Sequence, residues 1–288
     1  KNQMKAQFEN KIMSSILLYL DHEVLRKGEA FTNHSGLFYG VRDSYSDYSV
    51  YSLPFKQIVN DTSISGANIL SGVYVNNNFV TGGQSGLHSI NHYQGQAFFT
   101  ADRSSDTLSG NYSVKDFNFY LTSQPEETLL FDTKFKINPK HDQTLTGLAE
   151  NEQTYPAVYV KSVGGSNVPF AFGGQDSSLM TIRAIVVSDS SFKLDAINSI
   201  FRDLSKTNFA LFGSSDLPFN ALGSTTSGSF NYSTLSSSVI SNADKSVYIE
   251  NVVVNKVSNY VESSKNLNKN VYLSYVDFDL EIPRFPRQ

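Results

Sequence analysis

The chain of 288 residues contains no cysteine and no tryptophan. Without thiols it forms no disulfide, and thiolate zinc sites, iron–sulfur clusters and cysteine nucleophiles are excluded. The same absence fits either redox side of a membrane, so it leaves the compartment open. Carbohydrate-binding platforms often use tryptophan, so its absence weighs against a sugar-binding surface. Tyr and Phe nevertheless make up 13% of the chain, and they supply all of its aromatic contact area.

Charge is also sparse. Charged residues are 17% of the chain, and 23 basic against 27 acidic residues give a net charge of -4. This is the wrong sign for a protein whose main surface binds a phosphate backbone. Because 40% of the residues are hydrophobic and charge is low, charge-driven disorder is not expected. The composition predicts a globular protein with a buried core and many loops rich in Ser, Asn, Gly and Thr.

Long hydrophobic runs are missing as well. The one run that resembles a targeting signal, residues 12–20, is far below the roughly 18 apolar residues that span a bilayer. Glu9 precedes it, Asp21 and Glu23 follow it, and no small-residue cleavage site is present. We therefore interpret the run as part of a soluble helix and expect no membrane partner.

Two segments have the apolar spacing of an amphipathic helix. The first spans residues 3–27, and Gly28 supplies its C-terminal stop. The second begins near Asp189 or Ser191, either of which is a suitable N-cap. The apolar stripes are Phe8, Ile12, Ile16, Leu20 and Val24 in the first helix, and Leu194, Ile197, Ile200, Phe201 and Leu204 in the second.

Between residues 36 and 121, short aromatic and β-branched runs alternate with Gly, Asn, Asp and Ser. Residues 70–83 predict a hairpin that turns at three consecutive asparagines, since Asn tolerates the positive φ of tight turns. Residues 87–100 and 110–121 predict further strands, the second with one register break, and Gly95 and Gly110 mark turns. Together these segments predict an antiparallel β module, which we place at residues 36–125.

The remainder of the chain mixes strands with a helix. Strands are predicted at residues 129–137, 155–160, 181–187, 247–257 and 271–282. The fold class is therefore α+β: residues 126–288 form a mixed sheet with packed helices, and residues 1–35 pack on it as an N-terminal helix. Residues 208–244, rich in Ser, Gly, Thr and Asn, predict a long extended arm. Loops of that length are usually functional or disordered.

Motifs that carry chemistry are scarce. His88 and His92 would share one face of a strand, which permits a metal pair if an Asp joins them, but exposed polar residues are the simpler interpretation. The glycine pairs at 164–165 and 173–174 lack the context of a phosphate-binding loop and are interpreted as turns. No HExxH helix and no GxSxG elbow occurs.

The acidic residues near the C-terminus are explained by the pattern of a strand and do not require a catalytic site. Asp277, Asp279 and Glu281 alternate with apolar residues, as in a strand with one wet and one buried face. We therefore expect no catalytic residues, no cofactor and no metal, and predict that the chain is not an enzyme. The Tyr-rich segment with Tyr45, Tyr48 and Tyr51 could bind a sugar or a protein, and we favour protein contact because interface cores are rich in aromatic residues.

The order of elements in the second half is two strands at 155–160 and 181–187, the second helix, and two final strands. With the long first helix, this order resembles the tail terminators and related neck proteins of tailed bacteriophages. In that family, a long first helix and a helix that follows the central strands pack on a mixed sheet, and the subunits form a ring. The resemblance covers the first helix and about residues 129–288, so the module at 36–125 would be an insertion.

The resemblance implies a structural virion protein that is assembled in the host cytoplasm. It would form a hexameric ring in the neck, terminate the tail tube and join it to the head connector. Its partners would be other copies of the chain, tail tube and sheath proteins, neck or connector proteins, and DNA that passes without sequence-specific binding. The alternative is a receptor- or glycan-binding β-rich module of a tail fibre or surface protein.

A ring needs heterologous contacts between copies. Two groups of residues are our candidates for the subunit interface. Phe209, Phe212 and Phe230 would anchor the arm on a neighbour, and Asp195, Arg202 and Lys206 would lie on the exposed side of the second helix.

Overall fold

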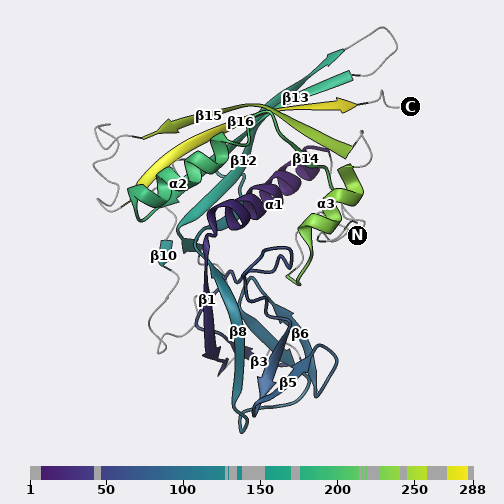
Figure 1. The fold of residues 1–288 in the computed structure, drawn as a ribbon, viewed down its shortest axis with the longest axis vertical. Helices are drawn as coiled ribbons and strands as arrows, with labels where there is room; N and C mark the ends of the chain where they lie inside the picture. The colour runs from purple at the N-terminus through teal and green to yellow at the C-terminus, as the bar shows by residue number, and fades with distance from the viewer. Residues whose placement is uncertain are drawn as a thin grey trace.

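The computed structural model describes residues 8–41, 47–126, 129, 135–137, 153–169, 176–213, 216, 218, 227–240, 245–257 and 271–284. Figure 1 shows two parts, a sheet covered by helices and a smaller part built of strands alone. The predicted α+β class, with a mixed sheet and an antiparallel β module, is confirmed. No helix in these ranges is long and apolar enough to cross a membrane.

After the first helix, most of the described elements are strands, and two further helices lie in the second half of the chain. In chain order they are α1 (Phe8–Gly28), β1 (Phe31–Leu37), β2 (Tyr39–Gly40), β3 (Ser49–Ser52), β4 (Gly72–Val75), β5 (Asn78–Thr81), β6 (Leu87–Asn91), β7 (Gln96–Phe99), β8 (Leu108–Lys115), β9 (Asn118–Leu121), β10 (Phe135–Ile137), β11 (Gln153–Tyr155), β12 (Ala157–Pro169), β13 (Asp176–Ser188), α2 (Ser191–Arg202), β14 (Asn208–Ala210), α3 (Tyr232–Ile240), β15 (Ser246–Lys256) and β16 (Tyr272–Arg284).

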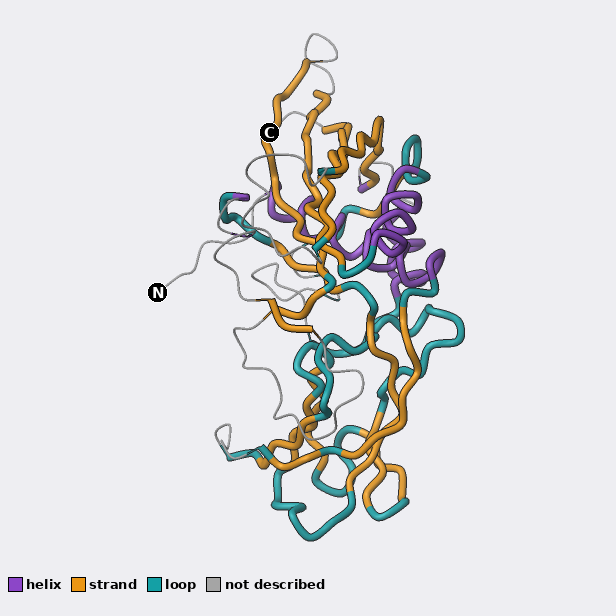
Figure 2. Tube along the Cα trace, turned by 90° about the vertical axis from the view of Figure 1, so that its left-hand side faces the viewer, coloured by secondary structure: helices purple, strands orange, loops and turns teal. Residues whose placement is uncertain are grey.

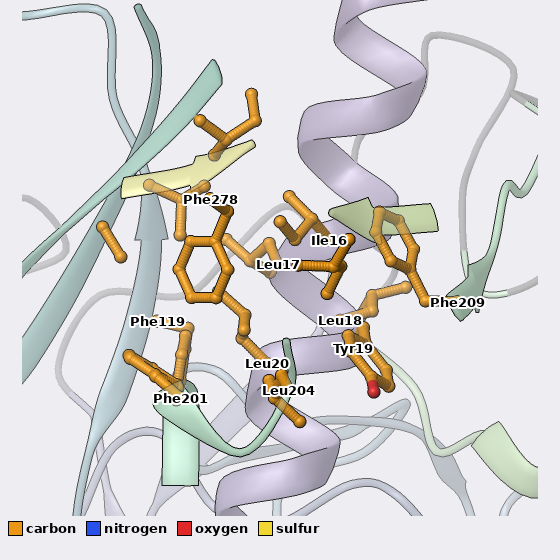
Figure 3. Close-up of a cluster of buried hydrophobic side chains, with 14 of the residues drawn as sticks. Ile16, Leu17, Leu18, Tyr19, Leu20, Phe119, Phe201, Leu204, Phe209 and Phe278 are labelled. Carbon is orange, nitrogen blue, oxygen red and sulfur yellow. The ribbon is translucent and has the colours of Figure 1, made fainter. Parts of the chain in front are cut away.

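The main sheet has the strand order β14-β15-β16-β13-β12-β9. Its neighbours are antiparallel except β9 and β12, which pair in parallel. The helices α1 and α2 cover one face of this sheet (Figures 1 and 2). The core between them contains Ile16 and Leu20 of α1, Phe201 of α2 and Phe278 of β16 (Figure 3). Burial of each such side chain contributes about 1.5–3 kcal/mol.

More residues of α1 are buried than the apolar stripe in its sequence predicts. Every residue from 14 to 25 is buried, including Asp21, His22 and Glu23. The helix is enclosed in this way because it packs on the sheet while its C-terminal half also meets the β module and α3. Charged side chains therefore lie inside the molecule, where the two parts join.

The β module consists of two antiparallel four-stranded sheets, ordered β1-β8-β4-β5 and β2-β3-β7-β6. Its boundaries differ from the predicted 36–125. The strand β1 pairs with β8 from Phe31↔Lys115 onward, and β9 leaves the module to join the main sheet. The described module therefore spans residues 31–115. The predicted register break near residue 116 is the point at which the chain passes from one part to the other.

The hairpin predicted at residues 70–83 is confirmed as β4 and β5, and both turn residues Asn76 and Asn77 have positive φ. The strand segment predicted at 87–100, with a turn at Gly95, is confirmed as a second hairpin formed by β6 and β7. Gly95 lies in its turn at φ +63, whereas Gly110, predicted as a turn, lies inside β8. At Gly110 a side chain would collide with Leu70 and Phe38, so close packing explains that glycine.

The backbone conformation and close packing of Gly95 predict that no larger residue fits at this position. A Cβ at this residue would overlap the carbonyl oxygen of Phe55, and the positive φ would add strain. We expect Gly95→Ala to lower the free energy of unfolding by about 2 kcal/mol, measured by urea denaturation. The matched control is Gly228→Ala, because nothing lies within 4 Å of its Cβ position. Equal stability of the two variants would contradict this assignment.

The strands β12 and β13 are longer than predicted. The glycine pair at 164–165 is not a turn but lies within β12, where the register shifts between Ser162 and Gly164. The pair at 173–174 lies outside the described residues. The N-cap of α2 is Ser190, which makes no capping hydrogen bond through its side chain, and not Asp189 or Ser191 as predicted. The helix itself begins at Ser191.

The predicted arm at 208–244 is more structured than its composition suggested. It contains β14, which pairs with β15, and the helix α3. Residues 214–215, 217, 219–226 and 241–244 of the arm lie outside the described residues. In the strand predicted at 129–137, Leu129 and β10 are described, and β10 pairs in parallel with β11.

Candidate functional site

A buried group of charged side chains joins α1 to the β module. Lys115 of β8 donates from Nζ to Oδ2 of Asp21 at 2.6 Å, and both side chains are at most 8% exposed. Burial raises the pKa of Asp21, and the Lys115 ammonium only partly offsets this effect. Oδ1 of Asp21 accepts no hydrogen bond. This ion pair fixes the position of the module on the main domain.

Asp61 is the second link between the two parts. Its Oδ2 lies 2.7 Å from Nδ1 of His22, and its Oδ1 accepts from the hydroxyl of Ser63 at 2.7 Å and from the backbone N–H of Tyr232 at 3.1 Å. Burial alone would raise the pKa of Asp61, but these hydrogen bonds outweigh burial, and its pKa is lowered. One carboxylate thus holds α1, the module and α3 together.

The contacts among Asp61, His22 and Ser63 hold the two parts of the chain together. The carboxylate lies between Ser63 and His22, so the imidazole is not placed to activate the hydroxyl as in a serine nucleophile site. The ring of His22 is stacked on Tyr232 at a centroid distance of 4.4 Å. Buried side chains that are hydrogen-bonded across the junction, as Asp61 and His22 are, are suited to fixing two parts in one orientation.

Phe230, predicted to anchor the arm on a neighbour, instead contacts its own chain. Its backbone N–H donates to Asn60 at 2.9 Å, and its carbonyl accepts from the backbone N–H of Thr62 at 2.7 Å. The half-buried side chain packs against the main core. The segment 227–231, which precedes α3, therefore contacts both the β module and the main core.

Phe209 and Phe212 also belong to the core of the chain itself. Each is 1% exposed, and Phe209 stacks on Tyr19 of α1 at 5.3 Å (Figure 3). In this structure neither ring is available to another subunit, so their predicted role as anchors on a neighbour is wrong. The reason is that β14 adds to the main sheet and turns their side chains towards α1 and α3.

Asp195, Arg202 and Lys206 are exposed, as expected. Asp195 pairs with Lys256 of β15 at 2.6 Å. Lys206 lies beyond the end of α2 at φ +64, with its ammonium 5.9 Å from the ring centroid of Tyr248. Their place in a subunit interface stays a prediction.

The two predicted histidines do not form a pair. His92 is buried and hydrogen-bonded to the carbonyls of Ser227 and Leu70, while the ring of His88 lies tilted against Tyr48 at a centroid distance of 4.5 Å. Burial lowers the pKa of His92, although both hydrogen bonds oppose the shift. Within the described ranges no group of three His, Asp or Glu side chains could hold a metal ion.

The Tyr-rich segment is less accessible than its composition suggested. Tyr45 lies outside the described residues, Tyr48 is half-buried, and Tyr51 is buried with its hydroxyl donated to Asp102 at 2.8 Å. Tyr51 lines a groove of about 490 Å³ together with Arg103 and the exposed residue Tyr39.

The face of the main sheet opposite α1 and α2 carries a row of polar pairs between β13 and β16. The pairs are Ser177–Glu281 at 2.7 Å, Thr181–Asp279 at 2.9 Å and Arg183–Asp277 at 2.6 Å. The predicted alternation along β16 is confirmed, since Phe278, Leu280 and Ile282 are buried on the helix side. A groove of about 730 Å³ beside these pairs is also lined by Val163, Asn251 and Lys206.

No protein-family model and no curated protein matches this chain. Its function is therefore inferred from its own surfaces.

Several of the exposed apolar side chains were not singled out from the sequence, and four of them lie on α2 and the β12–β13 hairpin. They are Phe192 (86% exposed), Val163 (53%), Val168 (45%) and Leu179 (38%). Phe192 could have been found, because it lies off the apolar stripe that contains Leu194, Ile197 and Phe201. The other three lie on the outer half of the β12–β13 hairpin, whose length the sequence pattern did not predict.

Proposed function

We propose that this chain is a non-enzymatic structural subunit of a tailed-phage virion. Copies of it form a ring in the neck at the head–tail junction, where the ring terminates the tail tube and joins it to the head connector. The subunit acts by contact alone, with other copies, with tail tube and sheath proteins, and with connector proteins, while DNA passes through without sequence-specific binding.

One observation carries the proposal. The long first helix and the helix that follows the strands β12 and β13 pack on the same face of a mixed sheet, which also contains the two final strands β15 and β16. This is the arrangement that the family resemblance implies. The β module is inserted between α1 and β9, in the place where the resemblance requires an additional part.

The buried links at the junction also support the proposal. Lys115–Asp21 and Asp61–His22 tie the module to α1 without a catalytic constellation. A ring subunit needs this kind of fixed geometry, because a small change of angle between its parts prevents closure of the ring.

Mass photometry of the purified full chain, combined with negative-stain imaging, tests this function. We expect closed rings, hexameric in mass, that bind to one end of added tail tubes. Monomer in both the purified protein and the virion would overturn the proposal.

A further inference from the structure

The strand β15 has an open edge over its second half. On the side away from β16, its first residues pair with β14, and Ile249 exchanges backbone hydrogen bonds with Lys206 and Thr207. Beyond Ile249, no described residue pairs with this side of β15, which lies at the border of the main sheet (Figure 1). Edge strands often carry proline or lysine, which block pairing, but Val252–Val254 contain neither. The open edge is therefore a template for a further strand.

The free backbone groups of this edge belong to Val252, Val254 and Lys256. In an antiparallel ladder, residues that exchange hydrogen bonds with one neighbour alternate with residues whose N–H and C=O point away from it. The N–H of Val257 donates to the carbonyl of Leu273 in β16 at 3.1 Å, and the register with β16 does not shift in the second half of β15. The odd-numbered residues of this stretch therefore bond to β16, and the even-numbered ones direct their backbone groups outward.

The sequence of this edge is complementary to itself. Residues 250–256 read Glu-Asn-Val-Val-Val-Asn-Lys, which is the same in both directions except for opposite charges at the two ends. When two such edges meet antiparallel with Val253 at the centre, Val252 of each copy lies opposite Val254 of the other. Both valines direct their backbone groups outward, so this register joins donors to acceptors as well as matching the side chains.

The faces of the two sheets agree in the same register. Val252 and Val254 are partly buried and pack against the core on the helix-covered face, while Val253 is 41% exposed on the other face. A two-fold axis perpendicular to the sheet keeps the helix-covered faces of both copies on one side. The valines that meet across the seam therefore share a face, where β-branched side chains pack well.

The position of α2 relates its charged side chains to the same axis. Asp195 of α2 pairs with Lys256 near the end of β15 at 2.6 Å, whereas the chain that leaves α2 meets β15 at Ile249, so helix and strand are antiparallel. An axis through Val253 therefore passes α2 between Asp195 and Arg202. These two residues are two helical turns apart and lie on one side of α2.

Rotation about this axis sets opposite charges across the seam. Asp195 of one copy comes level with Arg202 of the other, and Lys256 comes level with Glu250. Since α2 is centred on β16, the two helices lie about 14 Å apart across three strand spacings, a gap that two long facing side chains can span. The pair of Asp195 with Lys256 is more than half exposed and weak, so it can accept these further partners.

We propose that β15 of two copies pairs antiparallel across a two-fold axis at Val253, which joins their main sheets into one. The occupant of the open edge is a second copy of this chain. The contact is isologous and closes at two copies, so it is distinct from the heterologous contact that builds a ring. It goes beyond the proposed function and does not rest on it.

A charge at the axis tests this contact. Val253→Lys places two ammonium groups directly opposite each other, and we expect the half-dimerisation concentration, measured by sedimentation equilibrium, to rise at least about tenfold. Val253→Glu should act in the same way, whereas a mixture of the two variants should regain dimers. The circular dichroism spectra should stay those of the wild type, because the side chain is largely exposed. The matched control is Val163→Lys, at an exposed valine on β12, which should dimerise like the wild type.

The register is tested with cysteine, because the chain has none. The two Val253 residues form a non-hydrogen-bonded pair with Cα atoms about 4.5 Å apart, which is within the range of a disulfide. Val253→Cys should therefore give covalent dimers on mild oxidation, seen on a non-reducing gel. The matched control is Asn255→Cys on the same face, whose copies are about 13 Å apart along the strands and should stay unlinked. Linkage at 255 that equals or exceeds linkage at 253 would overturn the proposed pairing.

The wild-type dilution series separates this contact from the proposed ring. Rings that dissociate directly into monomers, and that form equally well with Val253→Lys, would overturn the pair and leave the proposed function standing. Dimers that are lost in Val253→Lys and never form rings would uphold the pair and overturn the ring. A wild-type chain that is monomeric throughout would overturn both.

Discussion

Lys115→Met is expected to lower the free energy of unfolding by about 3–5 kcal/mol, because it leaves the buried carboxylate of Asp21 without its partner. Oδ1 of Asp21 already has no hydrogen bond, so loss of the contact at Oδ2 leaves the whole group uncompensated. Urea denaturation followed by circular dichroism measures the change.

The double variant Asp21→Leu/Lys115→Met tests whether the lost stability comes from the unpaired charge of Asp21 or from a disturbed fold. Replacing both buried charges with apolar residues is often neutral, so most of the lost stability should return. Lys256→Met is the matched surface control, because its pair with Asp195 is more than half exposed and should contribute less than about 1 kcal/mol. A Lys115→Met variant as stable as Lys256→Met would contradict the assigned role.

Asp61→Ala is also expected to lower the free energy of unfolding strongly. It removes the acceptor of the Ser63 hydroxyl and of the backbone N–H groups of Ser63 and Tyr232, and it leaves His22 without its carboxylate. Since each buried donor left without an acceptor costs about 1–3 kcal/mol, we expect a loss of at least about 3 kcal/mol. Hydrogen exchange should show the segment 227–232 opening first.

The direction of the pKa shift of Asp61 predicts how the stabilities of the wild type and of Asp61→Ala differ with pH. The pKa of Asp61 is lowered in the folded chain, so its contribution is complete above the ordinary Asp pKa of about 3.9 and is lost as the pH falls towards the lowered value. Wild-type stability should therefore fall more steeply below about pH 4 than that of Asp61→Ala. Asp21 is present in both proteins, and its opposite shift cancels in the comparison. Parallel curves would contradict the role of Asp61.

The elements whose side chains repeat with a simple period are readable from the amino-acid sequence alone. The stripe of α1 and the alternation of Asp277, Asp279 and Glu281 with Phe278 are visible in the sequence, because a helix and a half-buried strand each repeat over a few residues. The Asn76–Asn77 turn was equally visible, since few residues accept positive φ there.

Which elements contact one another depends on packing between segments that are far apart in the chain. Phe209 and Phe212 resembled anchors in a polar arm, but pairing of β14 with β15 turns them into the core. Asp21, His22 and Asp61 are ordinary polar residues in the sequence, and they become a buried link because α1 is enclosed by the sheet, the module and α3. Contacts between residues far apart in the chain leave no local period, so only the packed fold fixes them.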